Sequence, residues 1–321
     1  MPEEDKMPRK LIAPFGLVAL VALSACDGGA PADANSQFAG AWTLVKIERF
    51  DADGELLEPP IDDRVGYIIY DPAGYMGVTL MQPDRRPRVG NQLTPEEALA
   101  SYSTYTSYFG TFTVNEAEGF VTHHLEGSLN TRGAGSDNKR FYTLSGNRLT
   151  LQPPAAANGN KTHITWEKLP DLPQSELTET HRRLFGFYRI ESVSRRIVDG
   201  ESVPADQYET AFIIYAPSGH MAVHLMRPGR EPYAGTQPAP EEALAAVQTY
   251  GSYFGPFSVH EDEGYLVHHQ IGNLTPRQSA IFDAQRFYEL TDTHLTLRPP
   301  ATTNRDGDQV QSALRWVRIS N

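Results

Sequence analysis

Two strands joined by a tight turn are expected in residues 67–81, which read YIIYDPAGYMGVTLM. The apolar YIIY run predicts a buried strand, and the DPAG run places Asp, Pro and Gly where a type I turn favours them. The returning strand alternates, so one of its faces carries Met76, Val78 and Leu80. This stretch therefore predicts an antiparallel hairpin with one face towards an apolar core.

The same pattern occurs a second time at 213–219, where IIYAPSG follows IIYDPAG by 145 residues. Repetition at this distance is typical of a duplicated domain, not of a solenoid of short units. We therefore expect two domains, 38–169 and 184–321, joined by a proline-containing linker at 170–183. The other motifs that recur are PEEALA (95 and 240), SYFG (107 and 252), HH (123 and 268), RFY (140 and 286) and LTL (149 and 295).

Each copy is predicted to consist mainly of short strands. About eight antiparallel strands per copy favour an all-β fold of two closed barrels, because closure removes exposed sheet edges. In the first copy the strands are expected at 42–47, 67–70, 75–81, 111–114, 120–125, 139–144, 148–152 and 162–168.

One short helix per copy is expected before the SYFG motif. In the first copy, Thr94, Pro95 and Glu97 supply a cap, a first-turn proline and a capping-box carboxylate. Gly110 is expected to end this helix. One face of it would carry the residues that recur at helical spacing, which are Ala98, Tyr102, Tyr105 and Phe109.

Several motifs together resemble a known family. The first copy opens with Gly40-Ala41-Trp42, which is similar to the Gly-x-Trp start of lipocalins. Tyr-x-Pro-x-Gly, Pro-Glu-Glu-Ala, Tyr-Phe-Gly, His-His and Arg-Phe follow in both copies, and this order resembles the lipocalin-like domain family of bacteria and fungi. The resemblance covers nearly all of both copies and implies a barrel with a cavity, without one established activity. The loop after His-His reads EGS at 126–128 but IGN at 271–273, so two ligand sites shaped by it would differ.

The N-terminal sequence predicts where the protein is located in the cell. The apolar run 11–23 is too short to span a membrane but suits a secretory signal, with Met7 as a candidate start. It ends in Leu23-Ser24-Ala25-Cys26, which resembles the lipobox of bacterial lipoproteins. That resemblance implies a signal at 1–25, an acylated Cys26, a flexible tether at 26–37 and a lipid anchor in the cell envelope, on either membrane. The alternative is an ordinary signal peptide with an incidental cysteine.

Composition and motifs exclude some classes of function. The chain has 40 acidic and 28 basic residues and a net charge of −12, which argues against a nucleic-acid partner. A single cysteine excludes an intramolecular disulfide framework and a thiolate-rich metal site. No phosphate-binding loop, Gly-x-Ser-x-Gly elbow or His-Glu-x-x-His motif occurs, so no cofactor is expected.

The paired histidines are the first candidate ligand-binding residues. Neighbouring residues on a strand point to opposite faces, so only one histidine of each pair can face a cavity. We expect His124 and His269 to face inwards, as hydrogen-bonding or acid–base groups, rather than His123 and His268. The alternative is a histidine that only satisfies its neighbours within the strands.

Arginine and tyrosine side chains are the other ligand candidates. An Arg and a phenol on one strand face could orient a carboxylate or carbonyl. The alternative for Arg140 is stacking on Trp42, as a late arginine commonly does in lipocalins. The candidates of this kind are Tyr70, Arg140 and Tyr142, with Tyr215, Arg286 and Tyr288 in the second copy.

Metal binding is a weaker expectation. His220 and His224 share a strand face in the second copy and could approach the His268-His269 pair. The first copy has Tyr75 and Thr79 at the matching positions, so the pattern is not repeated and no metal is expected.

The favoured function is therefore a lipid-anchored protein whose barrels bind or carry a small apolar or amphipathic molecule. The rivals are a barrel isomerase, cyclase or hydrolase that uses a His, Tyr or Arg of the cavity, and a scaffold lipoprotein without a ligand. The sequence indicates neither the ligand nor the oligomeric state.

Overall fold

The structure is a computed structural model that describes residues 34–90, 92–276 and 282–320. The predicted signal, Cys26 and the tether as far as residue 33 lie outside the described residues. Residues 33–321 form one compact unit that contains both domains. In the part of the chain that is described, no helix has the length and apolarity needed to cross a membrane.

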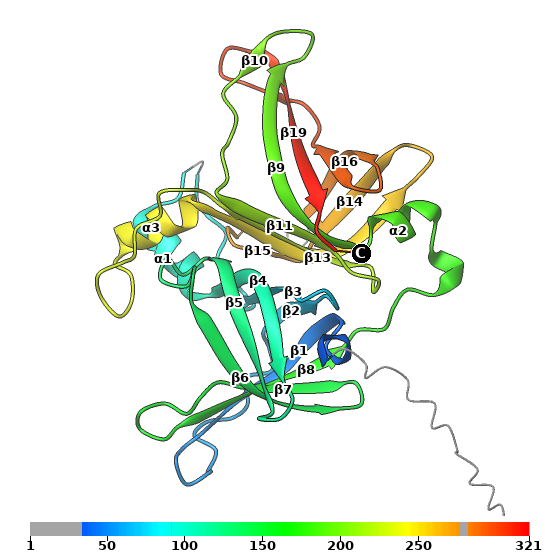
Figure 1. Cartoon of the computed structure of the whole chain (residues 1–321). Helices are drawn as coiled ribbons and strands as arrows, with labels where there is room; N and C mark the ends of the chain where they lie inside the picture. Colours follow the sequence, from blue (N-terminus) through cyan, green and yellow to red (C-terminus); the bar gives the residue numbers. More distant parts are fainter. Residues whose placement is uncertain (1–33, 91, 277–281, 321) are drawn as a thin grey trace, which may run out of the picture. The chain divides into compact units, whose positions relative to one another are not determined.

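The first domain is a closed antiparallel barrel of eight strands, in which each strand pairs with the next and the last pairs with the first (Figure 1). Its strands are β1 (Gly40–Phe50), β2 (Val65–Tyr70), β3 (Tyr75–Met81), β4 (Tyr105–Asn115), β5 (Phe120–Ser128), β6 (Asp137–Ser145), β7 (Arg148–Gln152) and β8 (Lys161–Lys168).

The second domain repeats this barrel, and its ring closes through pairing of β19 with β9. The all-β prediction of two eight-stranded barrels is therefore confirmed. The ring consists of β9 (Gly186–Ile197), β11 (Thr210–Tyr215), β12 (His220–Met226), β13 (Tyr250–His260), β14 (Tyr265–Gln270), β16 (Phe282–Leu290), β17 (His294–Arg298) and β19 (Gln309–Arg318). Three two-residue strands are added to it, β10 (Ser202–Val203), β15 (Gly272–Asn273) and β18 (Thr302–Thr303).

Each barrel carries one helix between its third and fourth strands, α1 (Pro95–Ser103) and α3 (Pro240–Gln248). The expected capping box is present: the amide of Glu97 donates to Thr94 Oγ1 at 3.2 Å, and the amide of Thr94 donates to Glu97 Oε2 at 3.0 Å. The predicted end of this helix is wrong, because Tyr105 and Phe109 belong to β4. That strand pairs along its length with β3 and β5, and this ladder outweighs a helical spacing that the aromatic residues also satisfy.

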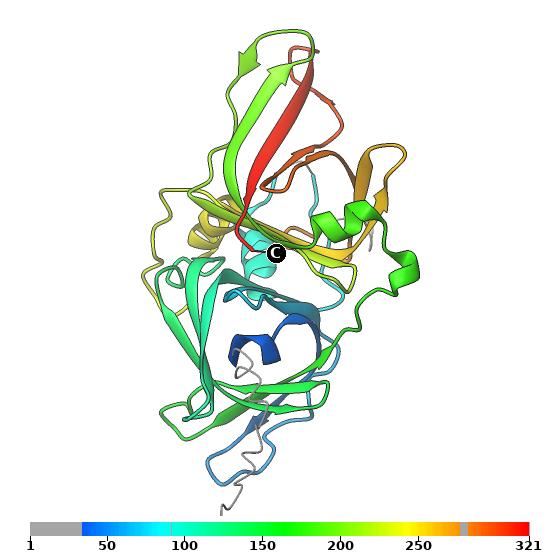
Figure 2. The ribbon, with the colours of Figure 1, turned by 45° about the vertical axis from the view of Figure 1, so that its right-hand side comes forward.

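The segments before each barrel are also ordered where they are described. The last four residues of the predicted tether form the 3₁₀ helix η1 (Ala34–Gln37), and Phe38 after it is fully buried in the first barrel. In the view of Figure 2, η1 (dark blue) is seen against the end of this barrel, and none of its four residues is buried. The linker contains η2 (Gln174–Glu176) and α2 (Glu179–Leu184), and Leu184 is buried in the second barrel at the equivalent place.

Strand alternation divides the barrel wall into an inner and an outer face. Met76, Val78 and Leu80 point into the first barrel, as predicted, and pack with Trp42 and Trp166. The opposite faces of the same strands are apolar too, and they form one core with the outer face of the second barrel. That shared core contains Tyr67, Ile69, Tyr105 and Phe109 from the first barrel and Phe212, Ile214, Tyr250 and Phe254 from the second.

The contact between the barrels has a pseudo-twofold symmetry. Arg85 donates to the carbonyls of Asn273 and Leu274, both at 2.6 Å. The equivalent Arg230, 145 residues later, donates to the carbonyls of Ser128 and Leu129. These four acceptors are also equivalent in pairs, so each barrel binds the same loop of the other, as in an isologous dimer interface.

Candidate functional site

A buried histidine connects three strands inside the first barrel. His123 on β5 is fully buried, its Nε2 lies 2.7 Å from the Tyr70 hydroxyl of β2, and its Nδ1 lies 3.2 Å from the Tyr108 hydroxyl of β4. Both ring nitrogens therefore have a phenol partner in an otherwise apolar interior.

Arg140 of β6 lies beside this group. It is paired directly with Val121, whose side chain points inwards two residues before His123. Its charge acts on the Tyr108 hydroxyl, and its Nη1 donates to the backbone carbonyl of Lys139 at 2.8 Å. Among the described residues, no carboxylate forms an ion pair with Arg140, so its charge has only neutral partners there.

Burial decides the charge state of this group. It lowers the pKa of His123 to about 3, and the positive charge of Arg140 acts in the same direction. Burial also raises the pKa of Tyr70 well above its ordinary value and raises that of Tyr108. At neutral pH the imidazole and both phenols are therefore uncharged, and the guanidinium is the positive charge of the group.

The second barrel repeats the arrangement. His268 is fully buried, with its Nε2 at 2.8 Å from the Tyr215 hydroxyl and its Nδ1 at 3.0 Å from the Tyr253 hydroxyl. The charge of Arg286 helps burial to lower the pKa of His268 well below its ordinary value. We name the two sets the Tyr–His–Arg groups: Tyr70, Tyr108, His123 and Arg140, and Tyr215, Tyr253, His268 and Arg286.

The surroundings of the two groups differ. In the second barrel Gln270 is buried on the inner face, where the first barrel has Leu125. In the first barrel Asn138 is paired with the histidine, where the second barrel has Ala284. The amide side chains of Gln270 and Asn138 therefore lie at different positions in the two interiors, on different strands.

Sequence reasoning missed Tyr108 and Tyr253, although the repeated Ser-Tyr-Phe-Gly motif contains both. Because these tyrosines were assigned to a helix, their position beside the histidines could not be seen. Tyr142 and Tyr288 do lie on the inner face of their strands, and Tyr142 packs edge-on against Phe38 with ring centroids 4.9 Å apart.

The expectation that His124 and His269 face the cavity is wrong. Their side chains lie on the outer wall, 37% and 32% exposed, and each Nδ1 is 2.7 Å from an aspartate oxygen, of Asp137 and Asp283 respectively. The cause is register, because each histidine is paired directly with its aspartate across the ladder. Solvated carboxylates then hold these imidazoles on the outside.

The alternative of Arg140 stacked on Trp42 is also wrong. Lys168 of β8 lies over the Trp42 ring instead, with Nζ 5.6 Å from the ring centroid. In the second barrel Arg318 of β19 covers Tyr188 in the same way, at 4.6 Å. The last strand is the direct neighbour of the first strand in each ring, so its basic residue reaches that aromatic side chain.

The histidines considered for a metal do not meet. His224 is fully buried in the contact between the barrels, with Nδ1 2.9 Å from Ser107 Oγ, whereas His268 lies inside its own barrel. His220 packs edge-on against Tyr67 of the other barrel. The described residues contain no cluster of three or more His, Cys, Asp or Glu side chains that could hold a metal ion.

Several pockets lie at the surface of the described residues. One of about 510 Å³ is lined by α1 and the arginine-rich loop before it. Two more, of about 490 and 390 Å³, lie where the barrels meet and share Glu126, Gly135 and Glu209. The barrel interiors contain large buried side chains, which include Trp42, Trp166 and Phe112 in the first and Tyr188 and Trp316 in the second.

Comparison with known proteins supports the assignment of the two halves. Residues 39–169 and 185–319 both match the family described as "Lipocalin-like domain". No curated protein matches the chain.

Similarity to solved structures is weak. An uncharacterised protein, YLR301w from Saccharomyces cerevisiae, is 10% identical with a TM-score of 0.43, over 87% of this chain and 98% of that chain. A protein of unknown function from the DUF3598 family of Nostoc punctiforme is 13% identical with a TM-score of 0.23, over 89% and 97%. Bovine odorant binding protein is 11% identical with a TM-score of 0.25, over 47% and 79%. Scores this low carry no argument about function.

Proposed function

Because the chain belongs to the lipocalin-like domain family, we propose that its barrels bind a small amphipathic molecule with an acidic head group. Each half is a closed eight-stranded barrel, a size that can enclose one small ligand. The observation that carries the proposal is the Tyr–His–Arg group, which occurs in both barrels with the same hydrogen bonds.

The chemistry of the group favours an anion. Arg140 offers a guanidinium without a carboxylate partner among the described residues, and the phenols beside it are uncharged at neutral pH. A carboxylate would accept charge-assisted hydrogen bonds from the guanidinium and a further bond from a phenol. Apolar side chains of the inner wall would contact the rest of the ligand. Since Gln270 and Asn138 lie on different strands, we expect the two barrels to prefer different ligands.

The ligand can be detected directly. Protein purified with Cys26→Ser, which prevents acylation, should release a defined small molecule on solvent extraction, identified by mass spectrometry. The double variant Arg140→Gln with Arg286→Gln should retain about ten- to a hundredfold less of it, since each charged hydrogen bond contributes about 1.5–3 kcal/mol.

The matched control is Lys139→Gln. Lys139 neighbours Arg140 on β6 but points outwards, with its Nζ 3.6 Å from the centroid of the Phe120 ring. This variant should retain the ligand fully. Equal retention by the double variant would contradict the assigned role of the guanidinium.

A scaffold is the second candidate function, and the large side chains buried in both interiors favour it. Under this alternative, extraction releases no molecule and Arg140→Gln changes stability alone. The same purification therefore distinguishes the two functions.

We also propose that the protein is anchored to a bacterial envelope membrane through Cys26, with its barrels in the periplasm or at the cell surface. The lipobox-like Leu23-Ser24-Ala25-Cys26 supports this location. Cells fed labelled palmitate should label the wild-type protein and not the Cys26→Ser variant. Label that persists in the variant would overturn the assignment.

A further inference from the structure

Three polar side chains align across neighbouring strands on the outer wall of the second barrel. Ser258 of β13 has its Oγ 3.0 Å from His269 Nε2, and His269 Nδ1 lies 2.7 Å from Asp283 Oδ1. The distances are those of a nucleophile, a base and a group that orients the base. None of these residues belongs to the Tyr–His–Arg groups.

A second imidazole flanks the same hydroxyl. His260 Nε2 lies 3.4 Å from Ser258 Oγ, and its ring stacks on Tyr265 with centroids 4.4 Å apart. Stacking fixes the plane of this ring, so its Nε2–H could point at an oxygen held next to Ser258. The hydroxyl thus lies between one imidazole that can accept a proton and another that can donate a hydrogen bond.

We propose that Ser258 is a nucleophile for acyl transfer from small, unhindered esters. Ser258 Oγ attacks the ester carbonyl carbon while its proton passes to His269 Nε2, and Asp283 accepts the Nδ1–H bond. The carbon–alkoxy bond then breaks, and the leaving alcohol takes the proton from His269. Water adds to the acyl-serine with the same base, which releases the acid and restores the hydroxyl. His260 donates a hydrogen bond to the oxyanion of each tetrahedral intermediate.

The place of the group limits the substrate. His269 and Asp283 are 32% and 64% exposed, so an ester can approach from solvent. The three side chains lie on the outer wall of the barrel, where a large substrate would be only partly enclosed. Short acyl groups and activated leaving groups are therefore the expected class, because their turnover depends least on binding energy.

The first barrel supplies an internal control. Thr113, His124 and Asp137 repeat the geometry, with distances of 3.0 and 2.7 Å. The hydroxyl is here that of a β-branched threonine, and Asn115 occupies the position of His260. Asn115 is turned towards Glu118, to which its Nδ2 donates at 3.1 Å. This set has a more hindered hydroxyl and lacks the second imidazole.

The test uses the whole chain with Cys26→Ser, a fluorophosphonate probe and p-nitrophenyl acetate. One covalent adduct should form, map to Ser258 and disappear in Ser258→Ala, whereas Thr113→Ala should react like the parent. His269→Gln should slow both labelling and hydrolysis by about a hundredfold or more. Ser258→Thr, which copies the first barrel, should retain the fold by circular dichroism and lose most of the labelling. An unlabelled parent protein, an adduct at another residue, or equal rates in Ser258→Ala would overturn the proposal.

Discussion

Lowering the pH from 7 to 5 is expected to remove about 6 kcal/mol from the free energy of unfolding, near the total stability of an ordinary domain. His123, His224 and His268 are fully buried, and burial lowers the pKa of the first two to about 3 and that of the third well below its ordinary 6.5. Below pH 6.5 the unfolded chain binds at least three protons that the folded chain does not, and burial also lowers the pKa of His181 and His220. Stability therefore falls as the pH falls, by about 1.4 kcal/mol per histidine per pH unit.

Urea unfolding at several pH values between 7 and 5, followed by circular dichroism, measures this slope above the range in which carboxylates titrate. His224→Thr places the residue of the first barrel at this position, because Thr79 is its counterpart. His224→Gln is a second variant that does not titrate. Both should reduce the slope by about a third, whatever their stability at pH 7. A stability that stays constant between pH 7 and 5 would contradict the neutral, buried state of these rings.

Replacing Arg230 by alanine is expected to cost about 2–4 kcal/mol of unfolding free energy. The guanidinium donates to the carbonyls of Ser128 and Leu129 of the other barrel, and truncation removes this charged donor from both carbonyls at a partly buried contact. Burial already lowers the pKa of Arg230, but its ordinary value is high enough to keep it charged at neutral pH. Arg85→Ala should have a similar effect through Asn273 and Leu274.

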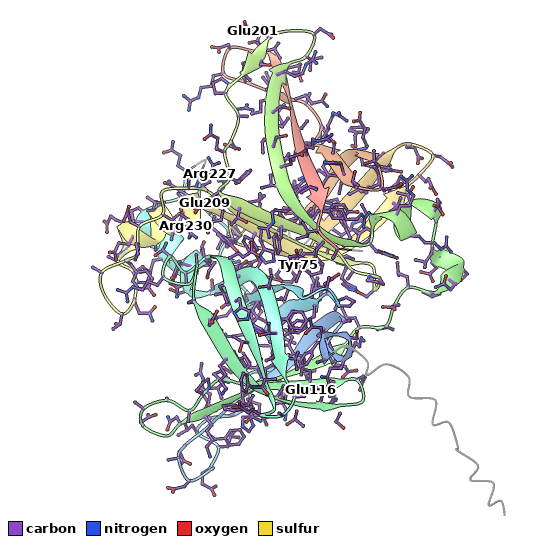
Figure 3. The ribbon with its side chains drawn as sticks, in the orientation of Figure 1. Tyr75, Glu116, Glu201, Glu209, Arg227 and Arg230 are labelled. Atoms are coloured by element: carbon purple, nitrogen blue, oxygen red, sulfur yellow. The ribbon has the colours of Figure 1, made fainter. Side chains whose placement is uncertain are left out.

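A nearby arginine provides the matched control. Figure 3 shows Arg227 and Arg230 on the same loop, beside Glu209. Arg227 forms an exposed ion pair with Asp206 at 2.9 Å, so Arg227→Ala should change stability by less than about 1 kcal/mol in the same urea titration. The double variant Arg85→Ala with Arg230→Ala should lose less than the sum of the single losses, since one loss already loosens the shared contact. Equal effects of Arg227→Ala and Arg230→Ala would show that the crossing arginines do not hold the barrels together.

Arg85 and Arg230 lie beside a core that the two barrels share. Ser107 and Ser252 meet at 2.9 Å across it, and each also lies 3.2 Å from a tyrosine hydroxyl of the other barrel. The symmetry is interrupted at His224, whose Nε2 has no hydrogen-bond partner among the described residues. Gly77 provides the room for this ring, because a Cβ there would lie 2.8 Å from His224 Nε2. The duplicated sequence thus forms, within one chain, a contact of the kind that joins two identical subunits.

Local sequence determined the barrels themselves. Alternation, turn residues and a capping box each depend on a few neighbouring residues. Because the sequence repeats after 145 residues, the second copy forms the same barrel as the first. The hairpin at 67–81 and the inward face of Met76, Val78 and Leu80 follow from these signals alone. The helix end did not, because Tyr102, Tyr105 and Phe109 fit a helical period, and only the pairing of β4 with β3 and β5 assigns the last two to a strand.

Tertiary structure decided everything that depends on which surfaces meet. Strand alternation requires one of two adjacent histidines to face inwards but does not say which one. His124 is paired with Asp137 across the ladder on the outer wall, so His123 faces inwards. The YIIY run indicated a buried strand, but its outer face packs against the second barrel, about 145 residues away, which no local pattern identifies. For the same reason no local pattern marks Arg85 and Arg230 as residues that join the two barrels. They are structural residues because the fold brings the carbonyls of a distant loop to them.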